Sequence, residues 1–368
     1  MKVGIITFQY AYNYGAVLQC LAMQRALEIL GVNSEVINYL PPKSKQLPFW
    51  RGWGISKGQC FKRVPNRIIG LRHGTAARKR FDDFRSEYLH LSSPCQTISE
   101  VADIADQYDA IITGSDQVWH FSNQSVYFLE WGRTYAGKRI SYAPSCGSEQ
   151  QPKKRNNEIA NWLKAFDCLS VRDECSRKVV SGLINQTPEI VADPTLLVDL
   201  SDIHKKIKLP YARYLLVYIL GEEIEGGHRQ IIQLIREKHG NLPTVVVIAS
   251  AHKPQKFHWA DRSIFDAGPR EWLYLIANAT FIYTDSFHGA LFSMKHKKPF
   301  LCYHAEDKRS ARLFDIAERY AVNSNVAGSL KEAIKKRFWN HLNYDKVNDL
   351  MNLHVETSFL YLKKALQL

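Results

Sequence analysis

Several signature motifs are missing from this sequence of 368 residues, and each absence excludes a class of function. No run of eighteen apolar residues occurs, which excludes a helix that crosses a membrane. There is no Walker loop, no His-Glu-x-x-His motif and no Gly-x-Ser-x-Gly elbow. The segment Tyr12-Asn13-Tyr14-Gly15-Ala16 after the first predicted strand lacks the three-glycine dinucleotide fingerprint, which argues against NAD binding there.

Cysteine is scarce, and its spacing indicates no shared site. The chain has seven cysteines, an odd number, and none forms a Cys-x-x-Cys pair. Residues 1–8 predict a first strand, because they are too short and too quickly polar for a secretory signal. We therefore expect a cytoplasmic protein with reduced, mostly buried thiols, and neither a disulfide framework nor a metal site.

Acidic residues are absent from residues 41–80, although the chain as a whole contains 36. This basic insertion holds eleven Lys and Arg residues, with Phe49, Trp50, Trp53 and Phe61 among them. Such a mixture suits the anionic inner face of a membrane, where each charge contributes roughly 1 kcal/mol and Trp lies at the interface. A solvated helical insertion whose aromatic side chains pack on the core is the other interpretation. Nucleic acid is not an expected partner.

Short apolar segments alternate with helical ones along the chain, which implies parallel sheets covered on both faces. At this length two domains are the default. We expect an α/β fold with two Rossmann-like domains facing each other across a cleft, as in GT-B glycosyltransferases. The expected parts are residues 1–200 with the basic insertion 41–80, residues 201–329, and C-terminal helices 330–368 that pack back on the N-terminal domain. Expected strands are 2–8, 34–39, 109–113, 139–143, 168–171, 214–220, 244–249, 281–284 and 300–303, and expected helices include 15–30, 82–91, 227–238 and 269–279.

The most informative segment is 281–293, which predicts a buried strand running into a helix that begins near Gly289. The turn between them carries Asp285, Ser286 and His288. Ligands of open α/β sheets bind at the carboxyl ends of strands, and a helix N-terminus adds N–H groups that suit an anion. A histidine there can move a proton near neutral pH. The alternative is structural, with Ser286 as an N-cap and His288 as an ordinary helix-start histidine.

Three other groups follow predicted strands. Arg172 can hold a carboxylate or phosphate through two hydrogen bonds, or it can pair with Asp173 at a helix start. The segment Gly114-Ser115-Asp116-Gln117 suits sugar hydroxyls, and an Asx-type turn is its structural alternative. The segment 308–312 is expected to precede a helix, either as a second anion clamp or as a solvated charged surface.

Six short segments occur along the chain in a fixed order. In this order they resemble the motifs of the polysaccharide pyruvyl transferase family over residues 1 to about 315. The resemblance implies a GT-B-like fold and transfer of a pyruvyl group from phosphoenolpyruvate to a sugar of a bacterial surface polysaccharide or its lipid-linked precursor, forming a cyclic ketal. The segments are Asn13–Gln19, Gly114–Trp119, Ser141–Pro144, Ser170–Arg172, Asp193–Leu197 and Thr284–Gly289.

The resemblance and the chemistry of the donor together suggest roles for individual residues. His288 would be the general acid or base, or a phosphate contact. No metal and no cofactor beyond the donor substrate phosphoenolpyruvate is expected. Expected donor contacts are Arg172, Ser286, Gly289, Arg309 and Arg312, and expected acceptor contacts are Asn13, Ser115, Asp116 and Gln117.

The chain departs from the family at the donor turn. Better-known members carry Arg-x-His, where this chain has Ser286-Phe287-His288. Either the segment 308–312 replaces the missing cation or the donor is not phosphoenolpyruvate. Two alternative functions therefore stay open: a GT-B glycosyltransferase that uses a nucleotide sugar, and a non-catalytic carbohydrate-binding subunit, in which His288 and Arg172 would be dispensable.

Overall fold

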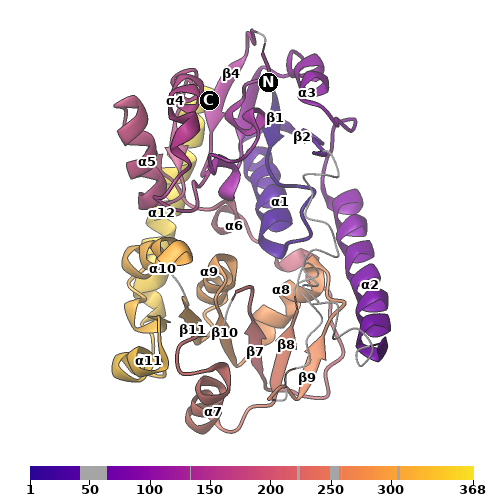
Figure 1. The fold of residues 1–368 in the computed structure, drawn as a ribbon, viewed down its shortest axis with the longest axis vertical. Helices are drawn as coiled ribbons and strands as arrows, with labels where there is room; N and C mark the ends of the chain where they lie inside the picture. Colours follow the sequence, from indigo (N-terminus) through magenta and orange to yellow (C-terminus); the bar gives the residue numbers. More distant parts are fainter. Residues whose placement is uncertain (42–63, 133, 222–223, 249–256, 258, 305–306) are drawn as a thin grey trace.

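The structure is a computed structural model that describes residues 1–368 except 42–63, 133, 222–223, 249–256, 258 and 305–306. Of residues 64–75 and 307–310 it describes the backbone alone. Two α/β halves lie end to end along the long axis, each built around its own sheet (Figure 1). None of the helices in this described part is long and apolar enough to cross a membrane.

The N-terminal sheet has four parallel strands in the order β2-β1-β3-β4. Its central strands β1 and β3 are buried and rich in isoleucine, as expected for strands covered on both faces. A short parallel pair, β5 and β6, extends this half beside β4 through a bridge between Ile140 and Cys168. The strands are β1 (Lys2–Ile6), β2 (Asn33–Val36), β3 (Ala110–Thr113), β4 (Lys138–Ser141), β5 (Ser170–Val171) and β6 (Glu189–Ile190).

The C-terminal sheet has six parallel strands in the order β12-β11-β10-β7-β8-β9. Strand β10 lies between β7 and β11, so its carboxyl end opens near the middle of the sheet. The predicted strand 281–284 is confirmed to the residue. The strands are β7 (Leu215–Tyr218), β8 (Thr244–Val247), β9 (Arg262–Ile264), β10 (Phe281–Thr284), β11 (Phe300–Tyr303) and β12 (Val326–Ala327).

Twelve α-helices of the described part cover the sheets and fill the seam between the halves (Figure 1). Helix α1 is buried on nearly every side, because it lies between the N-terminal sheet and elements of the C-terminal half. The helices are α1 (Tyr14–Ile29), α2 (Val64–Tyr88), α3 (Ile98–Ala105), α4 (Asn156–Lys164), α5 (Glu174–Ile184), α6 (Pro194–Leu197), α7 (His228–His239), α8 (Pro269–Asn278), α9 (Phe287–Lys295), α10 (Asp307–Arg319), α11 (Leu330–Lys336) and α12 (Tyr344–Leu366).

Two of the predicted element boundaries were wrong. The helix expected at 82–91 is α2, which begins at Val64 and so takes up the second part of the basic insertion. The basic segment 308–312 does not precede a helix but forms the first turns of α10. In both places the helix was predicted to begin too late, after a run of Lys and Arg, although both residues are good helix formers.

The part of the basic insertion inside α2 contacts the C-terminal half. Arg80 lies 3.2 Å from Asp266 and 3.8 Å from Glu271, while Lys79 pairs with Asp83 of its own helix. These two cations are therefore engaged within the molecule. Residues 42–63, which hold all four of the predicted membrane-facing aromatics, lie outside the described residues.

Helix α12 runs from the C-terminal half to the N-terminal one (Figure 1). Tyr361 Oη donates to the carbonyl of Ser141 at 2.8 Å, and Ser358 Oγ accepts from Ala192 N at 2.8 Å. The predicted boundary near residue 200 stays a prediction, because Leu200 and Ile203 lie in the same hydrophobic cluster as residues of both sheets.

Candidate functional site

The turn between β10 and α9 has the form that the sequence predicted, with the helix starting two residues earlier. Ser286 is the N-cap of α9, and its Oγ accepts from Gly289 N at 3.2 Å. The carboxylate of Asp285 is hydrogen-bonded to the backbone, because it accepts from Leu220 N and Gly221 N. Ser286 and Gly289, predicted as donor contacts, are thus already bonded to each other as parts of the cap.

His288 and Arg172 meet at a carboxylate that the sequence analysis did not single out. Asp193 Oδ2 accepts from Arg172 Nη1 at 3.0 Å and from Ser115 Oγ at 2.9 Å, and lies 3.4 Å from His288 Nε2. Arg172, Asp193 and Ser115 are at most 3% exposed. The alternative pairing of Arg172 with Asp173 is absent from this cluster, because Asp173 caps α5 through Ser176 N instead. We call these four residues the Asp193 cluster: Ser115, Arg172, Asp193 and His288.

The Asp193 carboxylate is ionised within this cluster. Burial raises its pKa, but the neighbouring His288 and Arg172 and the hydrogen bonds from Thr195 lower it more, so that its pKa lies well below the usual range. Thr195 contributes through its N–H at 3.1 Å and its hydroxyl at 2.7 Å, both to Oδ1. A buried, ionised carboxylate of this kind fixes the positions of the cation and the imidazole around it.

Gly15 closes the site from the side of α1. A Cβ atom at this position would lie 2.0 Å from His288 Nδ1 and 2.4 Å from its Cγ, so only glycine permits this approach. The ring of His288 is 8% exposed and is enclosed by the start of α1 on one edge and by Asp193 on the other. Gly15 belongs to the predicted segment Asn13–Gln19, but nothing in the sequence indicated what it contacts.

Arg172 has hydrogen-bonding capacity left. Its Nε and Nη2 are buried and have no hydrogen-bond partner among the described residues, while its guanidinium carbon lies 4.2 Å from the centre of the Phe287 ring. Beside it is a small cavity of about 10 Å³, lined by Arg172, Asp193, Asp315, Arg319 and His354 among others. Arg319 is already paired with Asp315 at 2.8 Å, so Arg172 is the guanidinium whose unused donors suit a carboxylate or phosphate.

The acceptor residues predicted at the end of β3 lie in different surroundings. Ser115 belongs to the Asp193 cluster and is fully buried. Asp116 is half-buried with φ of 80°, a conformation that costs a non-glycine residue about 1–3 kcal/mol and often marks a functional site. Its Oδ1 accepts from Gln117 N at 2.8 Å, and its Oδ2 has no hydrogen-bond partner in the part of the chain that the structure describes.

Gln117 and Arg312, expected on opposite substrates, contact each other across the seam. With its amide oriented to satisfy both groups, the Gln117 oxygen accepts from the two Nη atoms of Arg312 at 2.6 and 2.7 Å. Nearby, Glu174 N donates to Asp315 Oδ1 of α10 at 3.2 Å. Helix α10 is therefore held against the N-terminal half.

Asn13 and Arg309, two other predicted site residues, contribute little to the description of the site. Asn13 is the N-cap of α1, with its Oδ1 accepting from Ala16 N at 3.2 Å, so its side chain has a structural task. Arg309 lies in α10, outside the residues whose side chains the structure describes. No group of three His, Cys, Asp or Glu residues able to hold a metal ion occurs within the described ranges.

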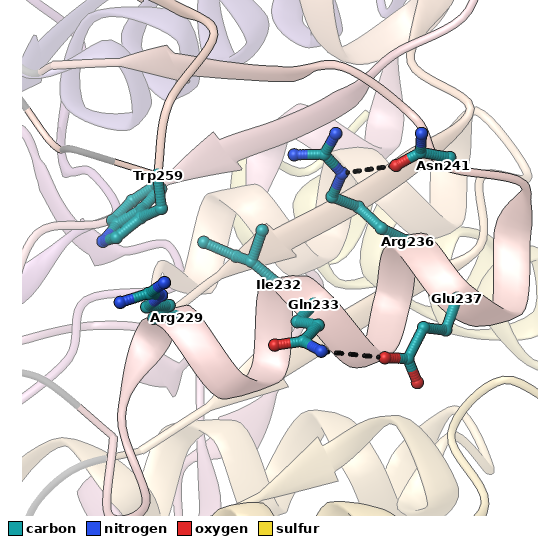
Figure 2. A pocket seen from close by; sticks show the side chains of 7 residues that line it. All are labelled: Arg229, Ile232, Gln233, Arg236, Glu237, Asn241 and Trp259. Carbon is teal, nitrogen blue, oxygen red and sulfur yellow. Dashed lines mark hydrogen bonds between the residues drawn. The ribbon is translucent and has the colours of Figure 1, made fainter.

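A larger concavity lies elsewhere, on the outer side of α7 (Figure 2). Ile232 and Arg236 line it from the helix, and Trp259 faces them. Polar side chains here satisfy one another: Arg236 Nε donates to Asn241 at 3.1 Å, and Gln233 donates to Glu237 at 3.0 Å. None of the predicted site residues lines it.

Solved structures with similar folds are GT-B proteins. UDP-GlcNAc 2-epimerase of Methanocaldococcus jannaschii, in complex with UDP-GlcNAc and UDP, superposes with a TM-score of 0.50 at 14% identity, over 96% of this chain and 99% of that one. A putative UDP-N-acetylglucosamine 2-epimerase of Listeria monocytogenes gives 0.51 at 12% identity, over 95% and 90%. UGT89C1 of Arabidopsis thaliana, complexed with UDP-L-rhamnose, gives 0.50 at 14% identity, over 96% and 92%. The predicted GT-B-like fold is thereby confirmed.

Comparison by sequence gives the family. No curated protein matches the chain. The model of one family, polysaccharide pyruvyl transferase, matches residues 13–303, which include all six of the predicted segments. These residues carry the Asp193 cluster, Gly15 and the turn before α9. The chain therefore belongs to the polysaccharide pyruvyl transferase family.

Proposed function

We propose that this protein transfers a pyruvyl group from phosphoenolpyruvate to a sugar of a bacterial surface polysaccharide or its lipid-linked precursor, forming a cyclic ketal. The observation that carries the proposal is the buried Arg172, which is oriented by Asp193 and still has Nε and Nη2 to donate. A planar guanidinium with two free donors matches the carboxylate or phosphate of this donor.

The reaction requires one proton to be added and two to be removed. A proton is added to the methylene carbon of phosphoenolpyruvate, so that the adjacent carbon accepts the oxygen of a first sugar hydroxyl, which loses its proton. A second hydroxyl then attacks the same carbon, loses its proton and displaces inorganic phosphate, which closes the ketal ring. His288 would deliver or accept a proton, and the ionised Asp193 would hold its ring in place.

Asp116 would serve the acceptor. Its half-buried Oδ2, at the mouth of β3, can accept a hydrogen bond from a sugar hydroxyl and favour its deprotonation. Asn13 and Gln117 would act indirectly in this scheme. Asn13 would fix the start of α1, and Gln117 would hold Arg312. Arg312 would supply the cationic charge that Ser286 cannot.

Binding of the donor would require α1 and α9 to separate. The ring of His288 is enclosed by Gly15 and Asp193, and Gln117 joins Arg312 across the seam, so this arrangement leaves little access. Opening between two domains followed by closure on the substrate is a usual way to exclude water from a reaction.

A nucleotide-sugar donor is the alternative, because the similar solved structures were obtained with UDP or UDP-sugars. Ligand-induced thermal stabilisation distinguishes the two. At 100 times its Kd a ligand stabilises by about 2.7 kcal/mol. We expect stabilisation by phosphoenolpyruvate and none by UDP-sugars, with the effect lost in His288→Ala and Arg172→Ala and kept in the exposed control His341→Ala. Stabilisation by a UDP-sugar alone would favour glycosyl transfer.

A non-catalytic carbohydrate-binding role is the third candidate, and activity measurements address it. Release of inorganic phosphate from phosphoenolpyruvate in the presence of acceptor glycans should depend on Arg172 and His288. If a glycan binds equally well to wild type and to both variants, and no phosphate is released, the catalytic proposal fails.

The basic insertion 41–80 would keep the enzyme, as a cytoplasmic protein, at the inner face of the membrane, where lipid-linked precursors are located. Its interleaved aromatics, and its cations other than Lys79 and Arg80, support this proposal.

A further inference from the structure

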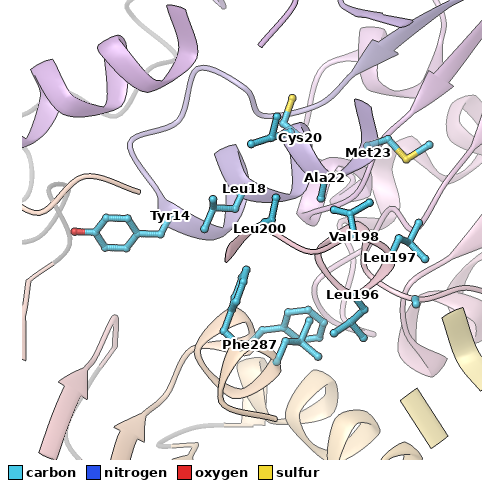
Figure 3. Packing of buried hydrophobic residues seen from close by; sticks show 14 of the residues in the cluster. Tyr14, Leu18, Cys20, Ala22, Met23, Leu196, Leu197, Val198, Leu200 and Phe287 are labelled. Carbon is cyan, nitrogen blue, oxygen red and sulfur yellow. The ribbon is translucent and has the colours of Figure 1, made fainter. Parts of the chain in front are cut away.

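Helices α6 and α9 meet across the seam between the two halves. Asp193 caps the start of α6, and His288 lies in the first turn of α9. The first contact between the two elements is that of His288 Nε2 with Asp193 Oδ2 at 3.4 Å. The segment of α6 passes between α1 and the helix that carries Phe287 (Figure 3).

Lys295, at the last residue of α9, makes the second polar contact. Its Nζ donates to the carbonyl oxygen of Thr195 at 2.6 Å and to that of Val198. These carbonyls belong to the end of α6, where helix carbonyls lack partners within the helix and a cation is favourable. Lys295 thus binds the C-terminal end of α6 while His288 binds the residue at its start.

Apolar packing fills the space between these two polar contacts. Leu196 and Leu197 of α6 and Phe287 and Leu291 of α9 are at most 9% exposed and belong to one hydrophobic cluster (Figure 3). Leucine packing alone allows small sliding of one helix along another, whereas the hydrogen bonds of Lys295 at one end and the 3.4 Å contact of His288 with Asp193 at the other oppose such sliding. The ammonium of Lys295 is the group that fixes it at the end distant from His288.

Burying the charged amine of Lys295 costs free energy. Burial lowers its pKa to about 8, against the opposing effect of Asp199 and Asp193. A buried ammonium is tolerated when its protons are bonded, and here two carbonyl oxygens accept them. Because the cluster around it is apolar, a hydrocarbon side chain would fill the same space without this cost.

We propose that Lys295 is a positioning residue, whose bonds to Thr195 and Val198 hold α9 in register with α6 and so hold His288 at Asp193. It is not one of the proposed donor contacts. Its effect on donor binding rests on the proposed function, whereas its effect on the His288 ring does not.

The test uses the full-length protein with three substitutions. Lys295→Met keeps the length and the apolar stem but cannot donate, and Lys295→Arg keeps the charge and the donors. Lys298→Met is the control: its amine is also partly buried near the end of α9, but it makes no bond to α6. Circular dichroism establishes that each variant is folded.

The direct readout is the ¹⁵N chemical shifts of the imidazole of His288 in NMR spectra, assigned by their absence in His288→Gln. We expect both shifts to move in Lys295→Met, to stay in Lys298→Met, and to return towards wild type in Lys295→Arg. The second readout is the Kd for phosphoenolpyruvate, expected to rise about tenfold in Lys295→Met, equivalent to ~1.4 kcal/mol.

The outcomes separate this inference from the proposed function. Unchanged His288 shifts in a folded Lys295→Met protein would overturn the positioning role. If wild type does not bind phosphoenolpyruvate, the proposed donor is wrong, and the NMR shifts still decide whether Lys295 positions His288.

Discussion

The backbone of Gly15 lies against the imidazole of His288, so that a Cβ atom at residue 15 would come within 2.0 Å of Nδ1. Gly15 belongs to the first helix of the N-terminal half and His288 to the turn after β10 in the C-terminal half. The histidine is therefore placed by both halves at once. A substitution at residue 15 acts on the proposed active site without removing any of its polar groups.

Gly15→Ala should displace His288 or push α1 and α9 apart. We expect a loss of about 1–3 kcal/mol in the free energy of unfolding, the usual cost of overpacking, together with loss of stabilisation by phosphoenolpyruvate. Chemical denaturation and thermal unfolding with and without the ligand measure both effects. Gly182→Ala is the matched control, because a Cβ there meets nothing within 4 Å and alanine favours the helix. Wild-type behaviour of Gly15→Ala would show that the seam is looser than described.

Asp193→Asn should be among the most destabilising conservative substitutions in the chain. It removes the negative charge that compensates the buried Arg172, and breaking a buried pair costs about 3–5 kcal/mol. Asp202→Asn removes the partner of Arg25 at a largely exposed site and should cost at most about 1 kcal/mol. Urea denaturation of the two variants compares them directly, and equal effects would contradict the central role of Asp193.

The free energy of unfolding should respond to Lys295 at alkaline pH. The pKa of this amine is lowered to about 8 in the folded protein, from an ordinary value of 10.5. Between roughly these two values the unfolded chain binds a proton that the folded one has lost, so stability rises with pH through this window. Asp199, Asp193, His204 and His296 are the titratable groups nearest to it.

Lys295→Met removes this contribution. Relative to the variant, wild type should therefore become more stable as the pH is raised from 8 to 10.5, as measured by urea denaturation at a series of pH values. The opposite slope would mean that the amine is more stabilised in its charged form than its burial indicates.

The basic insertion should bind anionic vesicles through its charge. Replacing Lys43 and Lys45 by Gln should weaken binding by roughly 1 kcal/mol per charge, because each basic residue near an anionic surface contributes about that amount. Lys153→Gln/Lys154→Gln removes two exposed cations elsewhere and serves as the control. Sedimentation with vesicles of neutral and anionic lipid measures binding, and no dependence on anionic lipid would count against the membrane proposal.

Much of the fold was predictable because it follows from local patterns. Buried strands such as Phe281–Thr284 are short apolar runs, and Ser286 followed by a helical pattern is a recognisable helix start. The starts of α2 and α10 were predicted too late, after the basic segments, although Lys and Arg are compatible with a helix whose packing the sequence does not reveal.

The sequence by itself determined the alternation of strands and helices, the turn that carries His288 and the ordered motifs of the family. Only the tertiary structure decided which of those residues meet. Asp193 follows a strand pair of the N-terminal half, yet it binds Arg172 and contacts His288, and Gln117 pairs with Arg312 rather than standing apart from it. The physical reason is that hydrophobic periodicity encodes which side of an element is buried, whereas the pairing of distant polar groups depends on how two sheets and the helices between them pack.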